Sequence, residues 1–191
     1  MRKAPDRAQG LALLDTSARA DASEAKAYRM KQIELAETNF QVVLDKLMPK
    51  LVRPLWMIYN FIVDTVYSMG HRIGKDAFIK QQRAIIGRID SRPQLAKISC
   101  PNLVLCGPDL ITPVGVHEEM ATAIPGSQLE VIEECAHFSV MGQPQLVSEA
   151  VRVWLQRIRQ SLRKTEVFCR SRRHAVFTAS ATPPHIYMRR G

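Results

Sequence analysis

The chain has 191 residues, 46% of them hydrophobic and 24% charged, which is the composition of a soluble globular protein with a core of its own. No cysteine pair has CxxC spacing, so we expect free thiols in a reducing cytoplasm rather than a disulfide framework. The N-terminal residues lack the apolar stretch of a signal peptide. Residues 51–69 are the most apolar, but Arg53, Pro54, Asn60 and Asp64 interrupt them, so we expect no membrane span.

The net charge of +9 is concentrated near the C-terminus. Residues 157–191 hold nine Lys and Arg against the single acid Glu166, and residues 163–191 show no helical period. We therefore expect a basic, disordered tail over 163–191. Such a tail is more often solvated than bound to a partner, and neither a binding fold nor a basic stripe interleaved with aromatic residues accompanies it. Nucleic-acid binding is accordingly the last-ranked function.

The first elements in chain order are a strand and a helix. Residues 10–15 form an apolar run after Gly10, which is typical of a buried parallel strand, with one turn of apolar helix as the alternative. Residues 23–47 have apolar positions at helical spacing. The pattern predicts a helix that starts with Ser23 as N-cap and ends at Pro49.

Two further helices are predicted before the chain changes character. The first covers residues 53–69 and closes at Gly70. The second runs from Asp76, a good N-cap, to Ile89. Together with the helix over 23–47 they make a helical segment between residues 23 and 91.

The second half alternates between strand and helix. Residues 101–107 and 129–132 read as strands, and residues 115–124 and 144–159 as helices. This order indicates βαβ units and a parallel sheet. We predict an α/β fold with a partial parallel sheet of about three strands and an inserted helical cap. The predicted segments are the sheet core over 1–22 and 92–162, the cap over 23–91 and the tail over 163–191.

Two side chains at strand ends are candidates for chemistry. Asp109 follows the strand over 101–107, and His137 follows the next strand. The carboxyl ends of parallel strands share one edge of a sheet, and an acid there can fix the tautomer of a histidine that acts as a general base. The alternatives are that Asp109 serves only its turn and that His137 is structural.

Several short motifs, in order, resemble the end of the α/β-hydrolase fold family. They are Asp109-x-x-Thr112-Pro113, Ala123-Ile-Pro-Gly-Ser127, Cys135-Ala-His137 and Gln143-Pro144, with residues 10–17 similar to the strand after the nucleophile helix. The resemblance implies that Asp109 orients His137, which acts as general base and then as general acid. It also implies hydrolysis of an ester or related bond without metal or cofactor.

The resemblance places residues 23–91 where the family carries its cap. Four cap residues, Trp56, Met57, Tyr59 and Phe61, are then expected to line an apolar acyl or leaving-group pocket. Plain packing between the cap and the sheet is the alternative for these four.

The chain also departs from the family pattern. It contains no Gly-x-Ser-x-Gly nucleophile elbow and no His-Gly oxyanion motif. The acid follows Gly107 one residue early, and Ala136 replaces the usual Gly. Neither Cys106 nor Ser139 lies in a strand–turn–helix elbow, so neither is a good substitute nucleophile.

Three functional readings follow from these departures. The chain is inactive alone and is completed by an N-terminal half that brings the nucleophile, with a small ester-like molecule as substrate. Alternatively, it is a non-catalytic fragment or pseudoenzyme, or it binds nucleic acid through its tail. In every case the strand over 10–15 would leave an unpaired sheet edge, through which the chain could associate with itself.

Overall fold

The computed structural model describes residues 3–160. The chain divides into two compact units, Met1–Arg152 and Val153–Gly191. Residues 144–160 are helical, which agrees with the helix predicted over 144–159. The expected tail over 163–191 lies outside the described residues, and the predicted division into core segments, cap and tail stays a prediction.

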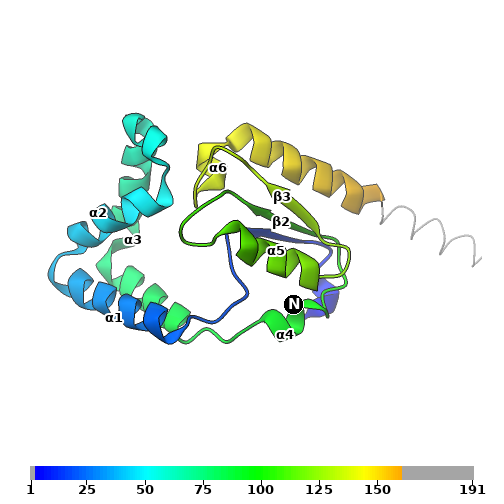
Figure 1. The fold of residues 1–191 in the computed structure, drawn as a ribbon, viewed down its shortest axis with the longest axis horizontal. Helices are drawn as coiled ribbons and strands as arrows, with labels where there is room; N and C mark the ends of the chain where they lie inside the picture. Colours follow the sequence, from blue (N-terminus) through cyan, green and yellow to red (C-terminus); the bar gives the residue numbers. More distant parts are fainter. Residues whose placement is uncertain (1–2, 161–191) are drawn as a thin grey trace, which may run out of the picture. The chain divides into compact units, whose positions relative to one another are not determined.

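A parallel three-stranded sheet forms the centre of the first unit, with the order β1-β2-β3 (Figure 1). The strands are β1 (Leu11–Leu14), β2 (Asn102–Cys106) and β3 (Gln128–Val131). This confirms the predicted α/β class and the three predicted strands. Leu14 pairs with Leu105 and Cys106 with Val131, so the chain leaves all three strands at the same edge of the sheet.

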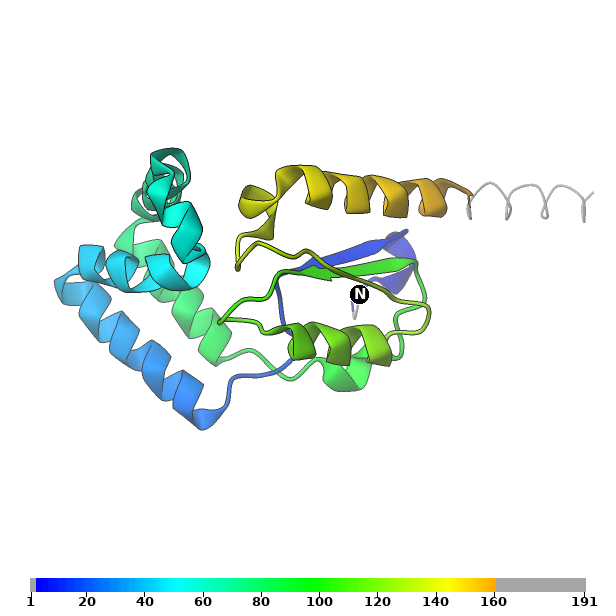
Figure 2. The same cartoon turned by 45° about the horizontal axis from the view of Figure 1, so that its top comes forward.

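The central strand is the most buried element of the fold. Its residues Leu103 to Cys106 are each 3% exposed or less, as a continuous apolar run in a parallel sheet should be. Helix α5 (Val114–Ala123) packs against β2 and β3, and the short α4 (Arg92–Leu95) packs against α5, on one face of the sheet (Figure 2). One hydrophobic cluster joins them, with Val104, Met120 and Ile124 at its centre.

The cap is helical, as predicted, but its helices begin and end at other residues. It consists of α1 (Ser23–Thr38), α2 (Phe40–Leu51), η2 (Pro54–Ile58) and α3 (Asn60–Ile86); the shorter η1 (Pro5–Arg7) and α6 (Ser139–Gly142) lie outside it. The single helix predicted over 23–47 is wrong, because Asn39 has non-helical backbone angles and its Oδ1 accepts a hydrogen bond from the Val42 N–H. Pro49 lies inside α2 rather than ending it. Ser23 makes no capping hydrogen bond.

Two glycines explain why the helix predicted over 53–69 does not end at Gly70. The predicted stop at Gly70 is wrong: the helix passes through it and breaks at Gly74, whose φ is 73°. A Cβ on Gly70 would lie 2.7 Å from a methyl carbon of Leu44, so Gly70 permits α2 and α3 to approach closely. Gly74 supplies the left-handed backbone that most other residues adopt at a cost. A second helical segment starts directly after this break, within two residues of Asp76, so the predicted helix start is close to the observed one.

Strand β1 is an edge strand, since β2 is its only partner within residues 3–160. Its four residues are only half-buried. A groove of about 640 Å³ runs beside it, lined mainly by apolar side chains that include Leu11, Leu13, Leu95 and Ile98. One face of β1 and part of the core around it are thus open to solvent. Within the described part of the chain, no helix is long and apolar enough to cross a membrane.

Candidate active site

The two predicted side chains, Asp109 and His137, meet at the carboxyl edge of the sheet. Asp109 Oδ2 lies 3.3 Å from His137 Nδ1. The Asp109 side chain is fully buried, and that of His137 is 20% exposed. The shorter segment after Gly107 and the alanine at position 136 therefore leave the pair within hydrogen-bond reach.

Hydrogen bonds from its own turn fix the Asp109 carboxylate. Its Oδ1 accepts from the backbone N–H groups of Ile111 (2.5 Å) and Thr112 (2.6 Å), and its Oδ2 accepts from Thr112 Oγ1 (2.9 Å). Asp109 therefore fills both roles that the sequence suggested for it: it stabilises its own turn and it contacts the histidine. Thr112 Oγ1 also lies 3.4 Å from His137 Nδ1.

The protonation of the pair follows from these contacts. Burial raises the pKa of Asp109, but the hydrogen bonds with His137 and Thr112 outweigh it, and the net shift is downward. Asp109 is therefore ionised at neutral pH and only accepts hydrogen bonds. Since the Thr112 hydroxyl proton is already donated to Asp109, the Nδ1 of a neutral His137 carries the proton, and its Nε2 keeps the free lone pair.

A second buried carboxylate at this edge, that of Asp15, was missed by the sequence reasoning. Asp15 directly follows β1, and its Oδ2 accepts hydrogen bonds from Ser139 N (3.2 Å) and Ser139 Oγ (2.5 Å). Its Oδ1 is buried and has no hydrogen-bond partner. Burial raises the pKa of Asp15, and the bonds from Ser139 oppose that shift. The sequence did contain a signal for Asp15, because it is an acid directly after a predicted strand. Asp109 was identified by that same criterion.

A buried histidine ties the loop after β1 to α5. His117 is fully buried; its Nε2 accepts from the Thr16 N–H (3.1 Å), and its Nδ1 lies 3.4 Å from the Pro113 carbonyl, to which it can donate. Burial lowers the pKa of His117, so the neutral form is favoured. We assign it a structural part in holding the edge that carries Asp15 and Asp109.

The two nucleophile substitutes considered from the sequence, Cys106 and Ser139, do not fit the role, and neither does the neighbouring Cys135. Burial raises the pKa of the Cys106 thiol to about 12 and that of Cys135 to about 11, so both thiols are protonated at neutral pH. Ser139 is fully buried, and its hydroxyl proton is donated to Asp15 rather than to His137. Within residues 3–160, no group of three His, Cys, Asp or Glu side chains is arranged to bind a metal ion.

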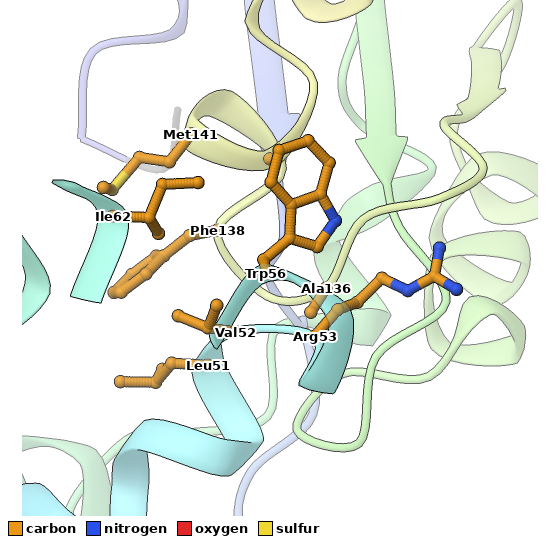
Figure 3. A pocket seen from close by; sticks show the side chains of 9 residues that line it. Leu51, Val52, Arg53, Trp56, Ile62, Ala136, Phe138 and Met141 are labelled. Atoms are coloured by element: carbon orange, nitrogen blue, oxygen red, sulfur yellow. The ribbon is translucent and has the colours of Figure 1, made fainter. Parts of the chain in front are cut away.

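The cap meets the histidine loop at a small seam, where Phe138 and Met141 face Leu51, Val52 and Ile62 (Figure 3). The cavity there has a volume of about 10 Å³, which is room for one water and not for a substrate.

Hydrogen bonds and one ion pair close this seam. Trp56 Nε1 donates to the Glu134 carbonyl (3.2 Å), the Phe138 N–H donates to the Leu51 carbonyl (3.3 Å), and Arg53 pairs with the Glu134 carboxylate (2.8 Å). The cap is thus fastened directly to the loop that carries the histidine.

The four predicted pocket residues differ in their exposure to solvent. Trp56 is half-buried and lines the seam. Met57, Tyr59 and Phe61 are 37%, 55% and 81% exposed. The structure therefore gathers Asp109 and His137 but leaves three of the four cap side chains in solvent, so a pocket around them stays a prediction.

Comparison with known proteins gives matches in structure only. No protein-family profile and no curated protein sequence matches the chain. The structure is similar to that of a thermophilic esterase from Thermogutta terrifontis, with a TM-score of 0.77 and 32% identity, over 82% of this chain and 59% of that one.

Two further solved structures share the fold at lower identity. One is an enol-lactonase from Burkholderia xenovorans (TM-score 0.72, 24% identity, 81% of this chain and 58% of that one). The other is an α/β hydrolase from a deep-sea metagenome library (TM-score 0.71, 18% identity, 81% and 58%). The chain spans less than three fifths of the length of each of these proteins. The sheet order, the helices inserted between β1 and β2 and these similarities show that the chain has the α/β-hydrolase fold, as far as its length extends.

Proposed function

We propose that this chain supplies the acid–histidine half of a hydrolase that cleaves an ester or a related bond in a small molecule. The observation that carries the proposal is the contact between Asp109 Oδ2 and His137 Nδ1 at the carboxyl edge of the sheet. An ionised buried acid on Nδ1 leaves Nε2 free to take a proton, which is what a general base requires. The esterase from Thermogutta terrifontis, which is 32% identical, supports the class of reaction.

His137 would act twice in such a reaction. Its Nε2 takes the proton from a serine hydroxyl as the serine oxygen bonds to the ester carbonyl carbon, and the Asp109 carboxylate stabilises the imidazolium that results. The imidazolium then gives that proton to the alkoxide as the ester C–O bond breaks. Water repeats the sequence on the acyl-enzyme and releases the acid. No metal or organic cofactor takes part in these steps.

The serine and the oxyanion donors must come from outside this sequence, which has no Gly-x-Ser-x-Gly elbow. We propose that a second polypeptide segment brings them and that the chain alone is inactive. Support comes from the open edge of β1 and from the apolar groove of about 640 Å³ beside it, where a further strand and helix could pack. Until that segment binds, the same edge is available for self-association.

The substrate would be small and at least partly apolar. Met57, Tyr59 and Phe61 form an exposed apolar surface on the cap, next to the seam that Trp56 lines. We propose that this surface contacts the acyl or leaving group once the second segment encloses the site. The free thiols of Cys100, Cys106 and Cys135 are consistent with a cytoplasmic protein.

The test has two arms that use a nitrophenyl acetate. In the first, the chain alone is compared with His137→Ala, and we expect no difference. In the second, a separately expressed N-terminal segment of a related esterase, carrying the Gly-x-Ser-x-Gly elbow, is added, and we expect turnover that His137→Ala abolishes. The same segment with its nucleophilic serine replaced by alanine is the matched control.

The results of this assay distinguish the three functional hypotheses. Turnover by the chain alone that depends on His137 would contradict the need for a second segment. A stable complex that stays inactive in the second arm would contradict the hydrolase proposal and favour a non-catalytic protein, which the absent nucleophile already suggests. Binding to duplex DNA that weakens steeply with salt would instead support a role in nucleic-acid binding.

A further inference from the structure

The carboxylate of Asp15 has no part in the proposed reaction, yet it is buried at the same edge. The backbone of Asp15 is left-handed, with a φ of 46°, a conformation that costs most residues free energy and that Asp and Asn tolerate better than others. A strained residue with a buried carboxylate persists only where its surroundings hold it. The contacts of Asp15 therefore indicate what it is held for.

Those contacts go to the loop that carries the histidine. Asp15 Oδ2 accepts both the N–H and the Oγ–H of Ser139, two residues after His137. The N–H of Phe138 donates on the cap side to the Leu51 carbonyl. His137 is thus followed by two anchored residues, one tied to the end of β1 and the other to the end of α2.

We propose that Asp15 is a positioning residue for the acid–histidine pair. Its carboxylate accepts the hydrogen bonds that hold Ser139, and with it His137, in place. His137 Nδ1 is thereby kept close enough to Asp109 to donate its proton to the carboxylate. The inference rests on the proposed function of Asp109 and His137 as an acid–base pair. At 3.3 Å their contact is at the long end of the range for a hydrogen bond, so a small displacement of the loop breaks it.

Two substitutions at position 15 separate the acceptor from the backbone strain. Asp15→Gly removes the carboxylate and suits the positive φ, so it adds no backbone strain to the loss of the acceptor. Asp15→Asn keeps a side-chain oxygen for Ser139 and also tolerates the left-handed backbone. If the acceptor is what matters, Asn rescues what Gly loses.

The readouts are spectroscopic and need no turnover. Nitrogen-15 spectra of the full chain at mildly alkaline pH report which ring nitrogen of His137 carries the proton, and amide exchange reports how firmly residue 139 is held. For the wild type and Asp15→Asn we expect the Nδ1–H tautomer and a protected amide. For Asp15→Gly we expect loss of that tautomer preference and roughly three- to tenfold faster exchange at Ser139, the effect of one lost hydrogen bond.

Ser139→Ala is the second variant, because it leaves residue 15 intact and removes only the hydroxyl donor. We expect it to fall between wild type and Asp15→Gly. An unchanged tautomer and unchanged exchange in folded Asp15→Gly, or an Asn variant as perturbed as the Gly variant, would overturn the proposal. Since the spectra are recorded without substrate, these results and the hydrolysis assay can fail independently.

Discussion

Asp109 and His137 stand 28 positions apart in the chain, yet Asp109 Oδ2 lies 3.3 Å from His137 Nδ1. Parallel pairing of β2 with β3 produces this proximity, because the segments that follow the two strands emerge at one edge of the sheet. The acid is fully buried and the imidazole is partly exposed, so the histidine is the member of the pair that a reacting group can reach.

Replacing Asp109 by asparagine should disable this arrangement with little change in shape. The asparagine amide can donate a hydrogen bond to Nδ1, which would move the imidazole proton to Nε2 and remove the base. We expect the tautomer signal of the chain alone to switch and the turnover of the complemented protein to fall ~10²–10⁴-fold. A fall of less than about threefold in a folded complex would show that Asp109 does not orient the histidine.

The buried His117 should make stability depend on pH. Its pKa is lowered in the folded protein, so below about pH 6.5 the unfolded chain binds the proton more strongly than the folded one. The stabilisation is therefore complete above that pH and is lost as the pH falls towards 5. Urea midpoints measured from pH 8 to pH 5 should decrease for the wild type.

The matched control for this prediction is His117→Gln, whose side-chain oxygen can still accept the Thr16 N–H but does not titrate. We expect a lower stability at pH 8 and a flatter profile between pH 8 and pH 5. If stability changes with pH by the same slope in both proteins, a group other than His117 causes the pH dependence.

The sheet could be predicted from sequence because its signals are local. The run from Leu103 to Leu105 is apolar without interruption, and Pro101 and Gly107 bracket it. The cap could not be predicted to the residue, because its boundaries depend on contacts between helices. Gly70 lies inside a helix, where it leaves room for Leu44 of α2, and no pattern within the sequence of α3 records that contact.

The site was predictable only in part, for a related reason. Asp109 and His137 follow strands that the sequence shows clearly, so their shared edge could be inferred. The bond between Asp15 and Ser139 joins residues 124 positions apart, and only the paired strands bring them together. The exposure of Tyr59 and Phe61 was likewise not visible, since an apolar run looks the same whether core or solvent covers it.

The two buried thiols at the active-site edge should be unreactive in the folded protein. With the pKa of Cys106 raised to about 12 and that of Cys135 to about 11, the thiolate that attacks a disulfide reagent is scarce at pH 8. We expect Ellman's reagent to modify both only in denaturant, whereas the half-buried Cys100 reacts in the folded protein. The double variant Cys100→Ser/Cys169→Ser provides the control, because Cys106 and Cys135 are its only thiols. Rapid labelling of that variant without denaturant would contradict the burial of this edge.

The open edge of β1 can be tested through a single backbone N–H. The N–H groups of Leu11 and Asp15 donate to the β2 side at 3.0 Å each. Since alternate residues of a strand present their N–H groups to opposite sides, those of Ala12 and Leu14 point to the open edge. Ala12→Pro therefore removes a donor from that edge while it leaves the pairing with β2 intact, and proline is tolerated in edge strands for this reason.

We expect the wild-type chain to self-associate at rising concentration in sedimentation velocity, and Ala12→Pro to weaken that association roughly tenfold. The same variant should bind the added N-terminal esterase segment less tightly, because both partners use one edge. Ala12→Ser keeps the N–H at nearly the same side-chain size and should behave as wild type. If Ala12→Pro is folded and associates as strongly as Ala12→Ser, the contact lies on another surface, and the exposed side chains of η2 are the next to substitute.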